Sequence, residues 1–342
     1  MQLYRTLRSS STSPPLFQRR QEVRRFEARG SQCRKRIMTR SVSTNNQAPI
    51  KSPKELARLQ VSSLEEQLMR PTSTPIGNPY HPREEQGQAL ATLLSDGCVY
   101  LPGVLREELC DALLADVDYR IAEVDRRRSE TAFLGGAPSR YDLKQPLEGV
   151  TLSAVQDALS SGLASILLGA SGDSALLCEL GVIASTPGAL RQPVHPDTVC
   201  TGDADEKPIY TSFIASFIAL QDVTDVMGPT CLIPATNNVA AHTALCGIEH
   251  QSHIDLLASS PSIRGTIRKG DCIIFDSRTL HCGGENFSDL RRVLMYISVQ
   301  SPASGATGLP PYPERRTPPS AYSMLSEYHN RFPLKSYLQW QG

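Results

Sequence analysis

The stretch KGDCIIFDSRTLHCGGEN, residues 269–286, carries the clearest information on the fold. Gly270 and Asp271 are turn residues, and the apolar run 272–275 has the length and composition of a buried strand. His281 follows just beyond this strand, beside glycines that allow a ligand or another backbone segment to approach closely. The pattern predicts a buried strand that delivers a histidine to one end of a sheet.

A second histidine and a carboxylate occur earlier, in HPDTV, residues 195–199. On an extended chain, residues i and i+2 point to the same side, so His195 and Asp197 can converge on one cation. The spacing alone is weak evidence, because it often arises by chance. Together with His281, however, it gives two histidines and one carboxylate. This is the facial triad of non-haem Fe(II) oxygenases, which leaves coordination positions open for a cosubstrate and dioxygen.

Arg292 follows His281 by eleven residues and begins the apolar run 293–299. A guanidinium at the mouth of a strand can hold a carboxylate through two parallel hydrogen bonds. We therefore expect Arg292 to bind the distal carboxylate of a dicarboxylic cosubstrate; the alternative is a surface salt bridge. Arg291 points to the opposite face of the strand, and we expect it in solvent.

The rest of the chain divides into an early helical half and a later half of short strands. Residues 84–94, 105–124 and 155–168 have helical patterns, with a short strand at 98–101 and a loop at 130–150. Apolar runs bounded by turn residues predict strands at 176–185, 211–221, 230–233, 272–275 and 293–299. Such an order favours a β-sandwich or barrel with a helical flank over an alternating α/β fold.

Four ordered motifs between about residues 83 and 300 resemble the phytanoyl-CoA dioxygenase family. They are LSDGCVYLPGVL (94–105), TPGALRQPVHPD (186–197), GPT followed by IP (228–230 and 233–234), and the 270–286 stretch. The resemblance implies a mainly β, cupin-like double-stranded β-helix, or jelly roll, with flanking helices and iron at one open end. It also implies that 2-oxoglutarate chelates the iron, that Arg292 grips its other carboxylate, and that Gln192 and Thr230 assist in binding it.

The same resemblance implies an Fe(II)- and 2-oxoglutarate-dependent dioxygenase. Such an enzyme uses dioxygen to hydroxylate a C–H bond of a small organic substrate, lipid or acyl compounds among the candidates, and releases succinate and CO2. Asp197 favours hydroxylation, because related halogenating enzymes replace the carboxylate with a small residue. Residues 234–237, Pro-Ala-Thr-Asn, depart from the Pro-Gly-Ser-His common in the family, which predicts a loop of different shape.

Two other classes of function are compatible with the triad. A zinc hydrolase can use the same ligands, but it leaves Arg292 unexplained and needs a general base that the sequence does not offer. A jelly roll without catalytic activity can retain the metal site while it binds a small molecule or a protein partner. The complete triad together with Arg292 favours the oxygenase over both.

Charge is distributed unevenly along the chain. Residues 1–50 contain eleven Lys and Arg but only Glu22 and Glu27, a surplus of nine, so a net charge of zero leaves minus nine for the remainder. An acidic body argues against nucleic-acid binding. No run approaches the eighteen apolar residues of a membrane span, so we expect none.

The basic, Ser-rich start has the composition of an organellar transit peptide, with a disordered basic tail as the alternative. We therefore expect residues 1–45 to be a leader that directs the protein to the mitochondrion; the plastid and the cytoplasm are the alternatives. Residues 46–80 contain several prolines and a short helical pattern near 54–69, which predicts a linker. The oxygenase domain is expected at 81–305, followed by a tail at 306–342, rich in Pro and Tyr, that packs on it.

Overall fold

Two β-sheets form the centre of the protein. The computed structural model describes residues 52–68, 74–75, 86–130, 139–200, 213–246, 250–301 and 334. A six-stranded antiparallel sheet has the order β2 (Cys98–Leu101), β8 (Cys272–Asp276), β5 (Phe213–Ala219), β10 (Arg292–Gln300), β4 (Leu176–Ser185), β3 (Arg140–Lys144). A four-stranded sheet has the order β1 (Thr74–Pro75), β7 (Ile263–Arg264), β6 (Thr230–Ile233), β9 (Leu280–Gly283), in which only β1 and β7 pair in parallel. The expected architecture, an antiparallel jelly-roll core flanked by helices, is confirmed.

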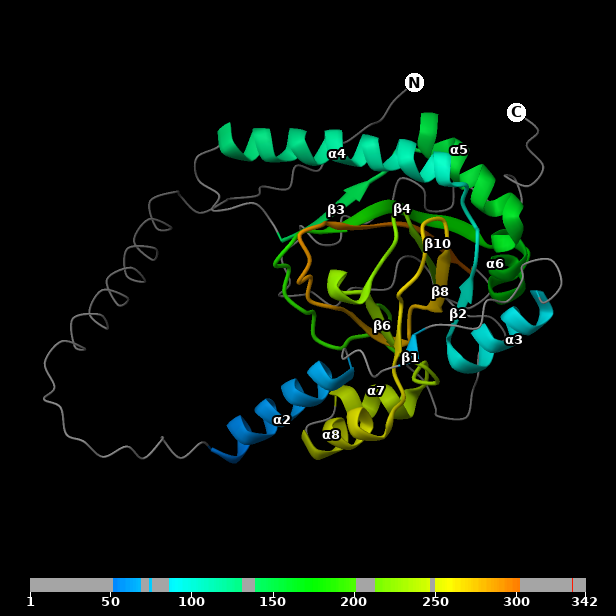
Figure 1. Cartoon of the computed structure of the whole chain (residues 1–342). Coiled ribbons are helices and arrows are strands. Elements are labelled where there is room, and N and C mark those ends of the chain that lie inside the picture. The colour runs from blue at the N-terminus through cyan, green and yellow to red at the C-terminus, as the bar shows by residue number, and fades with distance from the viewer. Residues whose placement is uncertain are drawn as a thin grey trace, which may run out of the picture. The chain divides into compact units, whose positions relative to one another are not determined.

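Helices cover the outer faces of both sheets, as Figure 1 shows. On the large sheet lie α3 (Gln86–Asp96), α4 (Glu107–Glu130), α5 (Gly149–Ala158) and α6 (Ala164–Ser171), the last two joined by a π-helical turn at Leu159–Leu163. Beside the small sheet lie α2 (Pro53–Leu68), α7 (Val239–Cys246) and α8 (His250–Ser259). A short 3-10 turn, Asp225–Met227, precedes β6.

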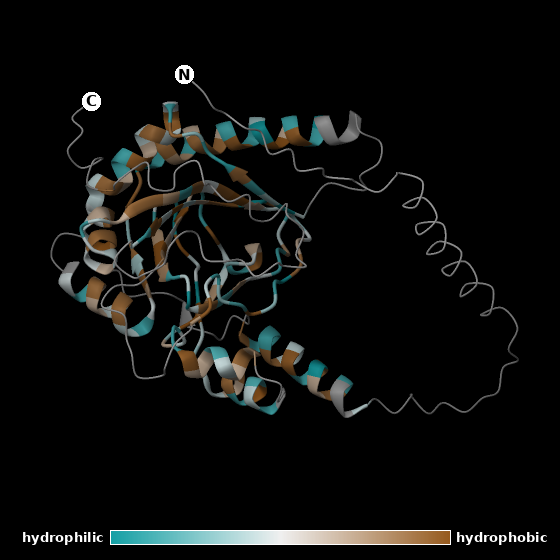
Figure 2. Ribbon diagram, turned by 180° about the vertical axis from the view of Figure 1, so that it is seen from behind, coloured by the Kyte–Doolittle hydropathy of each residue, from teal (hydrophilic) through white to brown (hydrophobic). Residues whose placement is uncertain are grey.

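The two faces of β10 show why the large sheet sits between helices and an interior cavity. Successive side chains of a strand point to opposite faces. The residues that face the helices are apolar and fully buried: Val293, Met295, Ile297 and Val299. The alternate residues face the other sheet: Arg292, Leu294, Tyr296 and Ser298. Burial of the apolar set, at about 25 cal/mol per Å2, holds the helical layer to the sheet, and in Figure 2 brown, hydrophobic residues gather between the two layers.

The structure corrects several expected elements. Residues 130–150, expected to be a loop, contain β3 and the start of α5, because Tyr141 and Leu143 pack into the main core. The helix expected at 155–168 begins at Gly149 and runs to Ser171. The strands β7 and β9 and the helices α7 and α8 were not predicted. In contrast, β2, β4 and β6 have the bounds that were predicted.

The helical stretch Gly149–Ser171 is, among the described residues, the single stretch long and apolar enough to cross a membrane. Half of its most apolar window is buried inside the protein. Its buried side chains, Leu163, Ile166 and Leu167 among them, belong to the main core beneath the large sheet. Its hydrophobicity therefore serves packing.

The packed body includes residues on both sides of the range expected for the domain. In the stretch expected to be a linker, α2 packs its apolar side chains Val61, Leu64 and Leu68 against the outer side of the small sheet. In the expected tail, Leu334 is buried and its backbone N–H donates to the carbonyl of Ala175 at 2.9 Å. The expected leader, residues 1–45, lies outside the described part of the chain.

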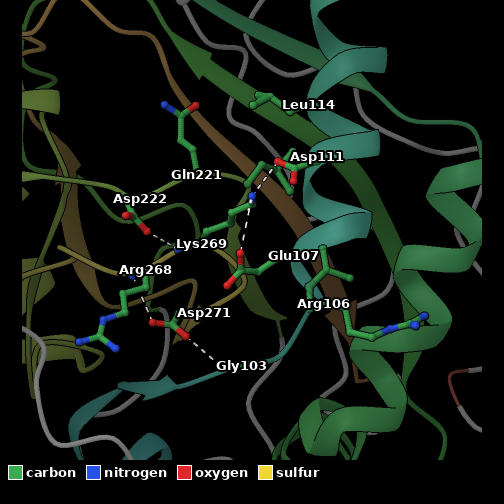
Figure 3. A pocket seen from close by; sticks show the side chains of 12 residues that line it. Gly103, Arg106, Glu107, Asp111, Leu114, Gln221, Asp222, Arg268, Lys269 and Asp271 are labelled. Atoms are coloured by element: carbon green, nitrogen blue, oxygen red, sulfur yellow. Dashed lines mark hydrogen bonds and ion pairs between the residues drawn. The ribbon is translucent and has the colours of Figure 1, made fainter.

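A large polar hollow, about 710 Å3, lies where the start of α4 meets the turn before β8. Lys269 spans it, with Nζ 2.7 Å from Asp111 Oδ1 and its backbone N–H donating to Asp222 Oδ1 at 2.9 Å (Figure 3). Asp271 accepts from the backbone N–H of Gly103 at 2.8 Å. Because these charged groups bond to other groups of the protein, we assign the hollow a structural role in joining α4 to the large sheet.

Candidate metal centre

His195, Asp197 and His281 meet in a cavity between the sheets. Their nearest ligand atoms all lie within 4.8 Å of one another. His281 Nε2 is 3.5 Å from Asp197 Oδ2, and His195 Nε2 is 3.8 Å from Asp197 Oδ1. Two imidazole nitrogens and a carboxylate at this separation form a facial set that can hold one divalent cation and leave its opposite side open.

Both histidines are oriented as metal ligands by the backbone. His195 Nδ1 lies 2.7 Å from the carbonyl oxygen of Pro193, and His281 Nδ1 lies 2.9 Å from that of Thr279. A carbonyl only accepts, so each Nδ1 carries the proton and donates. Each Nε2 is then unprotonated and its lone pair faces Asp197, which is the tautomer that metal binding requires.

The backbone also fixes the spacing of the three ligands. His195 and His281 form an isolated antiparallel bridge, in which each N–H donates to the other's carbonyl at 2.9 Å. The N–H of Asp197 donates to the carbonyl of Ser277 at 2.8 Å. Residues that lie 86 positions apart in the chain therefore hold a fixed separation that does not depend on their side chains.

Two arginines, Arg292 buried and Arg140 partly buried, lie in one register row of the large sheet. Ser185 on β4 pairs with Arg140 on β3 and with Arg292 on β10. The Ser185 hydroxyl accepts from Arg140 Nη1 at 2.6 Å and from Arg292 Nη2 at 3.2 Å. The other acceptors of the two guanidiniums are backbone carbonyls, those of Leu190 and Gly284 for Arg140 and that of Gly228 for Arg292.

Neither arginine forms an ion pair with an acid in the described part of the protein. Arg292 is only 2% exposed, and its Nε is buried without a hydrogen-bond partner. Burial, together with repulsion from the neighbouring Arg140, lowers the pKa of Arg292 to about 9. Burial also lowers the pKa of Arg140. Two desolvated cations without a counter-ion form a site for an anion, above all a carboxylate.

The cavity that joins these groups has a volume of about 110 Å3. Gln192 and Thr230, expected to help in binding the cosubstrate, both line it. Gln192 Oε1 accepts from the N–H of Gly283 at 2.9 Å, so the Gln192 side chain also ties its loop to β9. A Cβ at Gly283 would lie 2.6 Å from Gln192 Oε1 and 3.0 Å from Arg140 Nη1. Glycine at this position therefore gives the two polar side chains room to enter the cavity.

The wall away from the arginines is acidic and aromatic. Asp142 on β3 accepts from the Tyr296 hydroxyl at 2.9 Å, and Tyr296 has room because Gly181 lies opposite it without a side chain. Burial raises the pKa of Asp142 to about 6. Burial, together with repulsion from Asp197, raises the pKa of Glu179 on β4 to about 7.

The sequence analysis did not find this acidic wall. Glu179 is a charged residue inside the apolar run 176–185, which was a usable signal. Asp142 is two residues after Arg140, so the two share a face of β3, but that strand was expected to be a loop. The expectation for Arg291 was wrong as well: Arg291 forms an ion pair with Asp118 of α4 and is 28% exposed, because α4 covers this face of the sheet.

Known proteins give three comparisons with the chain. Dioxygenase FrzG from Cladobotryum sp. is 32% identical over 117 residues, 33% of this chain and 37% of FrzG, so the match spans well under half of that protein. EctD from S. alaskensis, solved with 2-oxoglutarate and 5-hydroxyectoine, is 15% identical at a TM-score of 0.48, over 69% of this chain and 82% of EctD. HygX from Streptomyces hygroscopicus, solved with nickel and 2-oxoglutarate, is 12% identical at a TM-score of 0.44, over 63% of this chain and 86% of HygX.

A family profile covers more of the chain than FrzG does. The profile of phytanoyl-CoA dioxygenase (PhyH) matches residues 93–293, well over half of the sequence. The matched residues include all three triad members and Arg292. The enzyme class of this family, an oxidoreductase of the dioxygenase type, is the class that the sequence predicted. The chain belongs to the phytanoyl-CoA dioxygenase family.

Proposed function

We propose that the protein is an Fe(II)- and 2-oxoglutarate-dependent dioxygenase that hydroxylates a C–H bond of a small organic substrate. The observation that carries this proposal is the combination, in one cavity, of the His195–Asp197–His281 set and two arginines that have no acidic partner among the described residues. The triad suits a divalent iron with open positions, and the arginines suit a carboxylate. A zinc hydrolase would leave the arginine pair without a role.

Each residue of the site has a separate task in this proposal. His195, Asp197 and His281 hold the iron, and Arg292, with Arg140 beside it, holds the distal carboxylate of 2-oxoglutarate. With iron and 2-oxoglutarate bound, the site supplies the chemistry for hydroxylation by dioxygen, with release of succinate and CO2. The residues around it position the reactants and exclude water, which strengthens the charged contacts.

The cavity wall limits the chemistry of the substrate. Its apolar part consists of Ile183, Phe213, Phe217 and Leu294, and its acidic part consists of Asp142 and Glu179. The apolar side chains suit a small lipid or acyl group. The two acids repel the phosphates of a CoA ester. Two basic residues near the cavity already have partners: Arg140 donates to Ser185, and Arg191 pairs with Glu65. We therefore favour an uncharged or amine-bearing substrate.

The location of the protein in the cell is part of the proposal. The basic, Ser-rich residues 1–45 support transport to the mitochondrion, with the plastid and the cytoplasm as alternatives. Fusion of residues 1–45 to a fluorescent protein tests this, because a mitochondrial leader carries the fusion into that organelle. A diffuse signal would contradict it.

Anaerobic titration of the metal-free protein with Fe(II) and then 2-oxoglutarate tests the proposed function. We expect the weak visible charge-transfer band typical of 2-oxoglutarate bound to Fe(II), and we expect it to vanish in His281→Ala. In Arg292→Ala the band should need much more 2-oxoglutarate. Iron binding without the band would exclude 2-oxoglutarate as cosubstrate and favour a binding protein that keeps a metal site.

A further inference from the structure

The helix α2 reaches the metal centre through one buried carboxylate. Glu65 lies near the C-terminal end of α2 and is only 6% exposed. Its Oε1 accepts from the backbone N–H of Val194 at 3.2 Å, and its Oε2 lies 2.7 Å from Arg191 Nη1. Val194 immediately precedes the metal ligand His195.

The Val194 amide points away from the small sheet, whereas its neighbours bond to that sheet. The N–H groups of Gln192 and His195 donate to the carbonyls of Gly283 and His281, each at 2.9 Å. The N–H of Val194 points to the other side, where Glu65 is its acceptor. A buried N–H without an acceptor is destabilising, so Glu65 holds the outer side of this segment while β9 holds the inner side.

The ion pair between Glu65 and Arg191 extends the contact to the residues that precede Val194. Arg191 is largely buried and also donates from Nη1 to the carbonyl of Gln192 at 2.9 Å. The end of α2 is anchored beside it, because the Leu68 carbonyl accepts from Ser262 Oγ at 3.1 Å and from Cys231 Sγ at 3.6 Å. Figure 1 shows α2 beside α7 and α8, next to the small sheet.

We propose that Glu65 is a positioning residue of the metal centre: through its hydrogen bond to Val194 it fixes the segment that presents His195 and Asp197. This inference rests on the metal centre of the proposed function. The helix that provides Glu65, residues 53–68, precedes the segment 93–293 that matches the family, so this support comes from outside the family domain.

Four variants of the full chain separate the hydrogen bond from the charge. Glu65→Ala removes both. Glu65→Asp keeps the charge but withdraws the acceptor from Val194 by one methylene. Glu65→Gln keeps an oxygen acceptor but loses the charge. Glu66→Ala is the matched control, because Glu66 is exposed and next to Glu65 on the same helix.

The measurement is the dissociation constant for Co(II) without any other ligand. The visible absorption of the bound Co(II) reports its binding, and a melting curve is recorded for each variant. Outer partners of metal sites typically contribute 10–100-fold to metal affinity. We therefore expect a dissociation constant about ten-fold higher in Glu65→Ala and Glu65→Asp, within about three-fold of wild type in Glu65→Gln, and unchanged in Glu66→Ala.

Several outcomes would overturn the inference. One is wild-type affinity in Glu65→Ala together with a lower melting temperature, which would show that Glu65 only docks the helix. If Glu65→Ala does not fold, wild-type Co(II) affinity in Glu65→Asp would likewise show that the hydrogen bond to Val194 does not position the metal ligands. Equal losses in Glu65→Gln and Glu65→Ala would assign the effect to the charge and reject the hydrogen bond. Failure of the wild-type protein to bind Co(II) would instead reject the metal centre itself.

Discussion

The two sheets have different tasks. The four-stranded sheet has short strands, and it holds the metal ligands through β9 and the backbone bridge from His195 to His281. The six-stranded sheet has the long strands β4 and β10, and it contributes the arginine pair, the acidic wall and most of the main core. The comparison teaches that iron binding depends on one sheet, while cosubstrate binding and stability depend on the other.

The largest expected effect is at the small sheet. His281→Ala removes one of three metal ligands, so Co(II) affinity should fall by more than about 100-fold, beyond the range for outer partners of metal sites. Absorption titration with Co(II) measures this, and circular dichroism checks that the fold persists. If His281→Ala retains tight Co(II) binding, the small sheet does not hold the metal.

A truncated core side chain in the large sheet should lower stability without changing metal affinity. Leu180 on β4 is fully buried in the main core, so Leu180→Ala should lower the free energy of unfolding by about 2–5 kcal/mol. Co(II) affinity of the folded protein should stay at the wild-type value. Chemical denaturation and the Co(II) titration, run on the same sample, test both halves. A parallel loss of metal affinity would show that the two sheets are not independent.

Within the large sheet, Arg292→Ala should lower the affinity for 2-oxoglutarate alone. Loss of a buried charged partner costs about 2–5 kcal/mol, which corresponds to at least about a 30-fold higher dissociation constant for 2-oxoglutarate. The affinity for Co(II) should not change. Isothermal titration of the Co(II)-loaded protein with 2-oxoglutarate gives the constant. Arg291→Ala is the matched control, because Arg291 immediately precedes β10 and pairs with Asp118 of α4.

Removing a charge from the acidic wall should have a smaller effect on stability, and one that depends on pH. Because the pKa of Glu179 is raised from 4.5 to about 7, the folded protein loses stability as the pH rises through this interval, where the unfolded chain ionises first. Glu179→Gln should therefore melt close to wild type at pH 5 and several degrees higher at pH 8, in metal-free protein. Melting curves at both values test this. An equal difference at both pH values would contradict the ionisation.

The smallest effect is expected at Arg291. Its ion pair with Asp118 is partly exposed, and such pairs contribute about 0–1 kcal/mol to stability. Arg291→Ala should therefore shift the denaturation midpoint only slightly and leave 2-oxoglutarate binding unchanged. A strong loss of cosubstrate affinity in this variant would contradict the placing of Arg291 outside the binding cavity.

The sequence predicted the cluster of His195, Asp197 and His281 better than the wall around it. His195, Asp197 and His281 were found because few residue types can hold iron, and β4 and β6 because their apolar runs end at turn residues. Arg140 and Asp142 escaped because β3 lies between a Gly- and Pro-containing segment and a helix start, without a run of its own. Packing against Tyr141 and Leu143 determines that strand, and such tertiary support leaves no local pattern in a sequence.

The backbone bridge between His195 and His281 has a consequence for the choice of metal. Because main-chain hydrogen bonds set the separation of the ligands, the site is preorganised, and a cation can enter without rearranging the fold. Such a rigid set of two imidazoles and a carboxylate does not discriminate by size among first-row divalent ions, and Co(II), Ni(II) and Cu(II) intrinsically bind nitrogen donors more tightly than Fe(II) does. We therefore expect the metal content of the folded protein to follow the divalent ions that are available to it.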